Sequence, residues 1–298
     1  MKIGVVLILV VLGLMGCSNE AEQPGDTDVG SSTDVHSDTE LRSDADGGDE
    51  PTGPSGVGQG CEGLFGRPGE NTGLDEEMCS PSCECEDGIW EAPDYDDEVI
   101  AELRRWSLVE ELVVPEVDPY KEGDVPDREG YCGVVVVDDA EKTYRLETFS
   151  TLEDLTDAGA RLTHGGRCGL CSTLQDLAVY MESMDLTGPV RQCGVQGLVH
   201  GEEEQRECIA ELGYSEGCTQ IWSWNTSHTG EVCRSICMPL LSAPYNNEDG
   251  SINDCLACDE EESGPIFQAV AGRTRRNSGI PSAICRPCDG VYRIVHAW

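Results

Sequence analysis

The pattern of apolar and polar residues is most regular over 164–184, where a glycine-rich turn leads into an amphipathic segment. Its apolar positions recur at the three- and four-residue spacing of one helix face. Ser172 can cap the first turn with Gln175 three residues later, and the Gly-Pro pair at 188–189 ends the pattern. We therefore predict a helix over about 172–185 and expect other elements to pack around it. Its inner face is formed by Leu174, Leu177, Ala178 and Met181.

The rest of the pattern predicts several helices and few strands. The apolar run Cys132–Val137 and the alternating run Thr143–Phe149 predict a β-hairpin. The apolar tail VYRIVHAW predicts a C-terminal strand that docks into the core. Together these elements define an α+β fold, rich in helices, with one small hairpin and a C-terminal strand. Further helices are expected at 97–112 with Ile100, Leu103 and Trp106 inward, at 202–212, 214–225, 229–238 and 251–258, from Pro265 with Ile266, Phe267 and Val270 inward, and between Ser150 or Thr151 and Gly159.

The chain begins with a short apolar leader. One lysine precedes an apolar run over 3–12, which is too short and too weakly flanked to span a membrane and is typical of a secretory signal. The LMGC sequence at 14–17 resembles the lipobox of bacterial lipoproteins, a resemblance confined to residues 1–17. It implies lipidation of Cys17, a lipid anchor in the bilayer and, with Ser18 next, sorting to the outer membrane or cell surface. The alternative is an ordinary secretory signal with an unrelated cysteine.

Composition changes sharply after the leader. The segment 18–60 consists mainly of Asp, Glu, Ser, Thr, Gly and Pro, and it carries 11 acidic residues against Arg42 alone. It cannot bury enough apolar surface to offset the entropy of ordering. We predict a disordered acidic tether, extended by repulsion between like charges.

The charge of the chain excludes some partners. It has 58 acidic and 19 basic residues and a formal net charge of −39. Such a field repels nucleic acid and anionic membrane surfaces, so neither is expected to bind directly.

Sixteen cysteines remain when Cys17 is set aside, and this even number in an exported chain predicts up to eight disulfides in an oxidising compartment. Three CxxC pairs would suit zinc in a reducing cytosol, but export favours disulfides. The segment 61–92 holds four cysteines and few apolar residues, so we expect a small module closed by two disulfides of its own. The main disulfide-rich domain then covers 95–298. The cysteines are Cys61, Cys79, Cys83, Cys85, Cys132, Cys168, Cys171, Cys193, Cys208, Cys218, Cys233, Cys237, Cys255, Cys258, Cys285 and Cys288.

Cys168 and Cys171 precede the predicted helix at 172–185, and a helix N-terminus favours a thiolate. Three interpretations remain open: two structural disulfides, a redox pair, or a nucleophile. CGLC resembles the thioredoxin-type CxxC without its flanking tryptophan. CGLCS is similar to the nucleophile segment of papain-like proteases, which implies Cys171 as nucleophile and His296 as base. Leucine and serine replace the usual small and aromatic residues, and no orienting asparagine follows His296.

Arg273, Arg275 and Arg276 form the one dense basic cluster in this acidic sequence. They either pair internally with acids such as Asp259 and Glu260, or they hold a carboxylate, phosphate or sulfate on a ligand. Under the second interpretation, charge reversal at Arg275 should abolish anion binding without unfolding the protein.

Two function classes therefore stay open, and no cofactor is identified. The preferred one is a binding protein that captures an anionic small molecule or a cell-surface partner through the arginines. The alternative is an extracytoplasmic enzyme of hydrolase or thiol type, with His164, His296, Asp259 and Glu260 as acid and base. The two histidines could converge, and each could equally make an ordinary polar contact. The chain contains no P-loop, dinucleotide fingerprint, HExxH or GxSxG sequence, and its five histidines form no metal motif by spacing.

Overall fold

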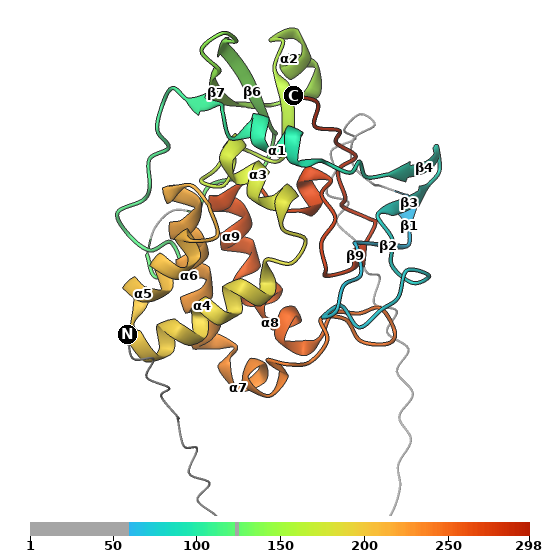
Figure 1. Cartoon of the computed structure of the whole chain (residues 1–298), viewed down its shortest axis with the longest axis vertical. Helices are drawn as coiled ribbons and strands as arrows, with labels where there is room; N and C mark the ends of the chain where they lie inside the picture. Colours follow the sequence, from blue (N-terminus) through green and yellow to red (C-terminus); the bar gives the residue numbers. More distant parts are fainter. Residues whose placement is uncertain (1–59, 123–124) are drawn as a thin grey trace, which may run out of the picture. The chain divides into compact units, whose positions relative to one another are not determined.

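The computed structural model describes residues 60–122 and 125–298. A four-stranded sheet lies at one end of this part, with the order β5-β7-β6-β8 (Figure 1). The first pairing is parallel and the other two are antiparallel. The predicted hairpin is confirmed, and the fold is α+β as expected. The strands are β5 (Ser107–Leu108), β6 (Tyr131–Asp138), β7 (Thr143–Phe149) and β8 (Arg161–Gly165).

Three helices adjoin this sheet. The predicted central helix is confirmed, although it is shorter, and Thr173 rather than Ser172 caps it by accepting from the Asp176 N–H at 3.1 Å. The short capped helix after the hairpin is also confirmed, with Thr151 as its cap. The helix predicted over 97–112 stops early because the chain turns to add β5 to the sheet. The helices are α1 (Asp97–Leu103), α2 (Leu152–Asp157) and α3 (Leu174–Glu182).

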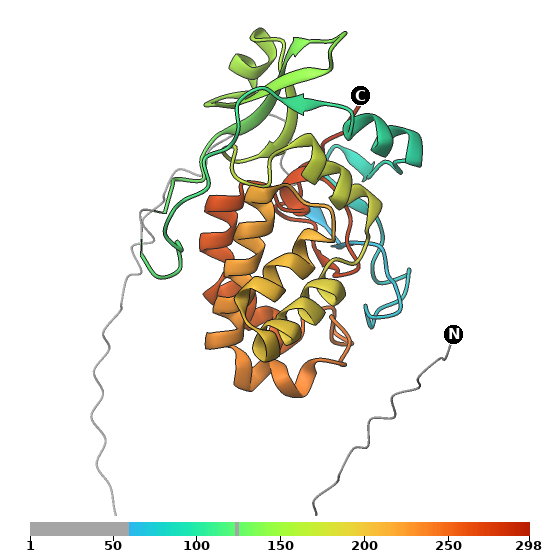
Figure 2. The same cartoon turned by 60° about the vertical axis from the view of Figure 1, so that its left-hand side comes forward.

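A second group of helices lies beyond α3, and Figures 1 and 2 show α6, α8 and α9 packed beside one another. The sequence did not predict α4, because its Gly-Pro pair was interpreted as a terminator. Pro189 instead occupies the first turn, where no backbone N–H is needed. The helix predicted over 229–238 is the end of α6 followed by the short α7. The elements are α4 (Thr187–His200), α5 (Glu202–Ala210), α6 (Glu216–Val232), α7 (Arg234–Cys237), η1 (Met238–Leu240), α8 (Asp254–Glu262), α9 (Gly264–Ala271) and η2 (Arg276–Ser278). Within the described ranges, no helix is long and apolar enough to cross a membrane.

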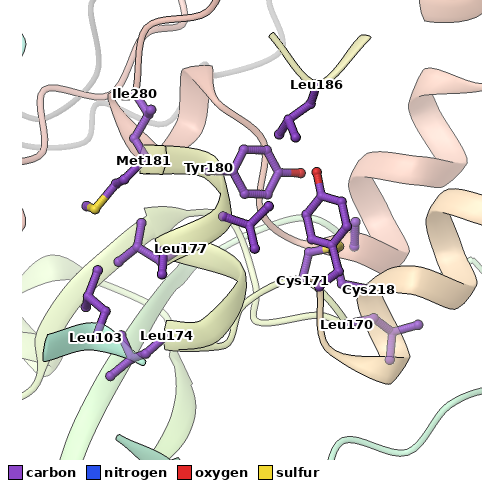
Figure 3. Close-up of a cluster of buried hydrophobic side chains, with 14 of the residues drawn as sticks. Leu103, Leu170, Cys171, Leu174, Leu177, Tyr180, Met181, Leu186, Cys218 and Ile280 are labelled. Atoms are coloured by element: carbon purple, nitrogen blue, oxygen red, sulfur yellow. A yellow bond between two sulfur atoms is a disulfide. The ribbon is translucent and has the colours of Figure 1, made fainter. Parts of the chain in front are cut away.

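The main core surrounds α3, whose apolar side chains point toward α1, the sheet and α6 (Figure 3). The glycine turn before α3 makes this packing possible. A Cβ on Gly169 would lie 2.4 Å from the carbonyl oxygen of Val270, and Gly166 has a φ of +84°. The turn can therefore lie directly against the end of α9. The core includes Leu103, Leu174, Leu177, Met181, Ile221 and Phe267.

Two small sheets complete the fold, on the right-hand side in Figure 1. The tail after β9 is not the predicted strand, although it docks as expected: Val291 and Ile294 are 1% and 4% exposed. The sheets are β1 (Cys61–Glu62), β3 (Ser82–Cys85) and β4 (Gly88–Glu91) in one, and β2 (Leu64–Phe65) with β9 (Arg286–Pro287) in the other.

All sixteen predicted cysteines form disulfides, eight in number, so the disulfide-rich character is confirmed. The expectation of a module closed by its own two disulfides is wrong, because Cys79 and Cys83 bond to the C-terminal segment. Cys233 and Cys237 both bond to α8. The pairs are Cys61–Cys85, Cys79–Cys285, Cys83–Cys288, Cys132–Cys168, Cys171–Cys218, Cys193–Cys208, Cys233–Cys258 and Cys237–Cys255.

Candidate binding groove

The turn after α9 places the three clustered arginines in three different environments. Arg273 is 0% exposed. Its guanidinium donates to the carbonyl oxygens of Cys171, Thr163 and Ser172 at 2.9, 3.0 and 3.1 Å. It also donates to the hydroxyls of Thr163 and Ser278. Burial lowers its pKa to about 10, so it remains protonated at neutral pH. Arg273 cannot contact a ligand, and its predicted ligand-binding role is corrected.

His164 is buried beside this arginine, at 0% exposure. Its Nδ1 lies 2.8 Å from the carbonyl oxygen of Gly165, and its Nε2 lies 2.7 Å from the hydroxyl of Ser172. Burial, and then the charge of Arg273, holds the pKa of His164 well below its usual value. A serine and a neutral histidine at this distance could act as nucleophile and base. Both are fully buried, so no substrate reaches them in this structure.

The docked tail brings His296 to the same buried network. Its Nε2 lies 2.9 Å from the carbonyl oxygen of Ser278, and its Nδ1 has no hydrogen-bond partner among the described residues. The two histidines therefore converge around Arg273, as the sequence allowed, but inside the protein. Their predicted role as acid and base on a bound substrate is not supported by this placement.

Acid should destabilise the fold through His296. Burial, followed by the charge of Arg273, lowers its pKa from 6.5 to about 3. Between these values the folded state binds fewer protons than the unfolded state, so stability falls as the pH falls. From pH 7 to pH 5 this residue should cost about 2 kcal/mol, at ~1.36 kcal/mol per pH unit. Urea unfolding of His296→Gln should show a pH-dependent loss smaller by that amount, and an unchanged loss would contradict the lowered pKa.

The CGLC sequence forms no redox pair. Cys168 bonds to Cys132 on β6, and Cys171 bonds to Cys218 on α6. Both sulfurs are used structurally, and Cys171 is 0% exposed. The thioredoxin-like and papain-like interpretations, with Cys171 as nucleophile, are therefore corrected.

Arg275 links the turn after α9 to the C-terminal end of α3. Its guanidinium donates to the carbonyl oxygens of Tyr180 and Pro281 at 2.9 and 2.8 Å, and also to that of Ser183. Carbonyls at a helix C-terminus lack partners within the helix, and a cation there is favoured by the helix dipole. The guanidinium also lies 5.3 Å from the centre of the Tyr180 ring. Arg275 positions the chain, and three of its donor contacts are already made.

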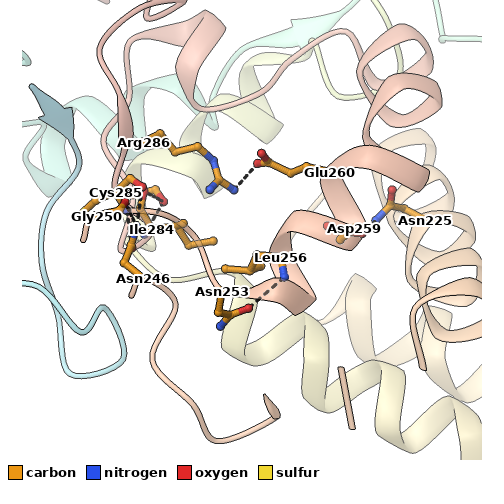
Figure 4. Close-up of polar contacts among 11 residues, drawn as sticks. Asn225, Asn246, Gly250, Asn253, Leu256, Asp259, Glu260, Ile284, Cys285 and Arg286 are labelled. Carbon is orange, nitrogen blue, oxygen red and sulfur yellow. Dashed lines mark hydrogen bonds and ion pairs between the residues drawn. The ribbon is translucent and has the colours of Figure 1, made fainter. Parts of the chain in front are cut away.

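Arg276 is the arginine with unused donors. No hydrogen bond or ion pair links its guanidinium to any residue in the described ranges, and it is partly exposed. The nearby Arg286, which the sequence did not indicate, pairs with Glu260 on α8 through Nη2 (Figure 4). Its Nη1 is buried and has no partner in the described part of the chain. Burial lowers the pKa of Arg286, the charge of Arg276 adds to this effect and Glu260 opposes it.

These two arginines lie in the wall of a groove of about 1030 Å³, between α4, α6, α8 and the segment after α9. Ligand sites commonly have roughly 300–1,000 Å³, so this groove is at the upper end. Its lining is balanced, with six basic and six acidic residues, although the chain as a whole carries −39. The basic residues are Lys121, Arg191, Arg234, Arg275, Arg276 and Arg286.

Other buried polar atoms in the wall lack partners. Tyr180 is 3% exposed, and its hydroxyl makes no hydrogen bond to a described residue; the same is true of Trp222 Nε1. Burial raises the pKa of Tyr180 to about 12, so its hydroxyl remains a donor at neutral pH. Unpaired buried donors are rare in folded proteins because each costs desolvation free energy. Of the ten buried side-chain nitrogen and oxygen atoms that lack a partner in the described residues, three belong to residues that line the groove, Arg286 Nη1 among them.

The two acids proposed as catalytic residues also line this groove. Asp259 accepts a hydrogen bond from the side chain of Asn225 at 3.3 Å (Figure 4). It also accepts one from the hydroxyl of Thr229. Burial raises its pKa, and the two hydrogen bonds oppose that rise. Glu260 is held by Arg286. Both carboxyl groups are therefore engaged in contacts between elements.

A smaller recess of about 510 Å³ shares Arg276 with the groove. Its wall also includes Arg128 and Arg167, and Arg128 donates to Gln268 at 2.6 Å. In residues 60–122 and 125–298, no cluster of three or more histidine, cysteine or acidic side chains could hold a metal ion.

Residues 202–294 match the model of a family of unknown function (DUF8771). The search of curated proteins and the search of solved structures found no match. The matched segment runs from α5 to the tail and includes Asp259, Glu260, Arg276 and Arg286. It excludes α3 and α4, which supply the opposite wall. Four disulfides join the segment to chain outside it, through Cys208, Cys218, Cys285 and Cys288.

Proposed function

We propose that this chain is an exported binding protein whose groove holds the anionic group of a ligand between Arg276 and Arg286. The observation that carries the proposal is that two neighbouring guanidinium groups in one groove have unused donors. Their like charges oppose each other, and an anion between them relieves that repulsion. Charge-assisted hydrogen bonds to guanidinium are among the stronger polar contacts in proteins.

The leader supports a lipid-anchored location for this binding protein. Its resemblance to a lipobox, which lies outside the described residues, suggests that Cys17 carries the anchor. Eight disulfides are in keeping with an oxidising compartment. The mass of the N-terminal peptide of the mature protein tests this part, because an unmodified cysteine, or a start beyond it, would contradict lipidation.

An enzymatic function has less support. His164 and His296 are buried away from the groove, Cys171 is in a disulfide, and the two acids are held by neighbouring side chains. The groove offers positively charged donors for binding. His228, which lines it, lies 2.9 Å from the hydroxyl of Ser263 through Nδ1, but Ser263 is 0% exposed, so no substrate reaches that hydroxyl in this structure.

Calorimetric titration of the full oxidised protein with acetate, sulfate and inorganic phosphate tests the anion site. Arg276→Gln should weaken binding about 10- to 100-fold, since a hydrogen bond to a charged group contributes ~1.5–3 kcal/mol. Arg286→Gln is combined with Glu260→Gln, so that no carboxylate is left unpaired, and should weaken binding similarly. Arg275 is unsuitable for charge reversal, because its substitution would release three carbonyl oxygens and destabilise the turn.

The matched control is Arg105→Gln, which removes a guanidinium whose side chain is 68% exposed and lies outside the groove. Its affinity should equal that of the unmodified protein. Equal affinity in Arg276→Gln would contradict the proposal. Loss of binding in Arg167→Gln, with binding retained in the Arg286 variant, would place the anion in the smaller recess instead.

A further inference from the structure

The groove has a second property that its charges do not explain. Fifteen large apolar side chains are exposed in the described part of the chain, and five of them line this one groove. Two lie on α4, and three lie on the opposite side, from the end of α6 to the residue after η1. They form what we call the apolar lips: Val195, Leu198, Val232, Met238 and Leu241.

The apolar lips continue into the groove toward the two arginines. Cys255 at the start of α8 is bonded to Cys237, next to Met238 of the lips. Leu256 is 5% exposed and lines the groove, and Glu260, one turn further along the same face of α8, pairs with Arg286. Along one wall of the groove, the exposed apolar lips are followed by buried apolar side chains and then by the unused guanidinium donors of Arg276 and Arg286.

Disulfides hold together the helices that carry the apolar lips. Cys193–Cys208 fixes α4 to α5, and Cys233–Cys258 and Cys237–Cys255 fix α6 and α7 to α8. These bonds preorganise the backbone on which the apolar lips lie. The apolar lips are 41% to 54% exposed in this structure. A ligand that covers them gains hydrophobic free energy without paying to organise the groove.

From these features we infer that the ligand is a single-chain amphiphile: an anionic head group bound at Arg276 and Arg286, with an apolar chain lying between the apolar lips. This inference rests on the proposed anion site and adds a site for the apolar chain of the ligand. A carboxylate and a phosphate both fit this head-group site, since guanidinium groups bind both. The ligand is taken up as a monomer, because a protein with a net charge of −39 is repelled by an anionic bilayer surface.

The contribution of the ligand's apolar chain is tested by calorimetric titration of the full oxidised protein with acetate, butanoate and octanoate, each below its aggregation concentration. Affinity should rise about fourfold for each buried methylene, or up to about 200-fold from butanoate to octanoate. The double variant Val195→Gln with Leu198→Gln should lose most of this gain and keep its affinity for butanoate. The control is Val199→Gln, at 71% exposure on the same helix but outside the groove, which should behave as the unmodified protein.

The possible failures are distinguishable. If Arg276→Gln weakens butanoate binding while chain length has no effect, the amphiphile is ruled out and the anion site stands. If octanol binds as tightly as octanoate and Arg276→Gln changes neither, the anion site is wrong, and the inference fails with it. If vesicles containing an anionic lipid bind and monomeric octanoate does not, the groove recognises a membrane surface, which also overturns the inference.

Discussion

Replacing Arg273 by methionine should lower the free energy of unfolding by about 4 kcal/mol, because removing one member of a buried charged network typically costs ~3–5 kcal/mol. The guanidinium satisfies three carbonyl oxygens and two hydroxyls that are sealed from water. Methionine has similar length and fills much of the same space, so the effect reports lost donors rather than an empty cavity. Each acceptor left unpaired lowers stability by ~1–3 kcal/mol. Removing the buried guanidinium also removes its own desolvation cost, which offsets part of this loss.

Urea unfolding at pH 7 measures this loss, with Arg276→Met as the matched control. Arg276 has no partner among the described residues, so its replacement should change stability by no more than ~0.5 kcal/mol. Arg273→Lys keeps the charge but supplies three donors instead of five, and should fall between the two. Equal stability of the Arg273 and Arg276 methionine variants would show that the network around Arg273 contributes little.

The contrast between these neighbouring arginines shows where sequence reasoning reaches its limit. Three arginines close together in the sequence, after a predicted helix, indicate a basic cluster, and both features are local. Which arginine turns inward depends on the carbonyl groups of the 163–172 segment, about 100 residues earlier in the chain. No local sequence pattern predicts this contact between the Arg273 guanidinium and the 163–172 segment. The acids proposed as their partners, Asp259 and Glu260, contact other side chains instead.

Local periodicity predicted α3 and the hairpin because their apolar faces are continuous in sequence. It missed α4, where a Gly-Pro pair begins a helix instead of ending one. It also assigned a strand to the tail, where Val291 and Ile294 are buried without pairing in a regular sheet. In both cases packing against distant elements decided the local structure.

Arg286 was overlooked although the sequence contained a usable signal. It lies between Cys285 and Cys288, and disulfides to two different partners would hold any residue between them in place. A lone basic residue in such a position, within an acidic chain, is a candidate for a fixed binding group. The CxxC spacing by itself indicates only a disulfide or a zinc site.

The two disulfides that flank Arg286 should act cooperatively on stability. Cys79–Cys285 and Cys83–Cys288 join the same two segments, so either one alone already closes the long loop. With the other disulfides intact, that loop follows a covalent path of roughly 100 residues, worth ~4.7 kcal/mol of chain entropy. The second bond closes only a loop of roughly eight residues, worth ~2–3 kcal/mol. Replacing one pair by alanine should therefore cost about 2–3 kcal/mol, whichever pair is chosen.

Replacing both pairs should cost about 7 kcal/mol, more than the sum of the two single-pair variants. Urea unfolding of the two single-pair variants and the four-alanine variant measures this difference, with Cys61–Cys85 replaced as the control for a bond within the N-terminal segment. Because ordinary domains have total stabilities of ~5–15 kcal/mol, the four-alanine variant should be largely unfolded or lose the docked tail. Strict additivity would mean that the two bonds constrain independent parts of the chain. The cooperative result would show that the two bonds act together to hold β9, and Arg286 within it, against the segment that contains Cys79 and Cys83.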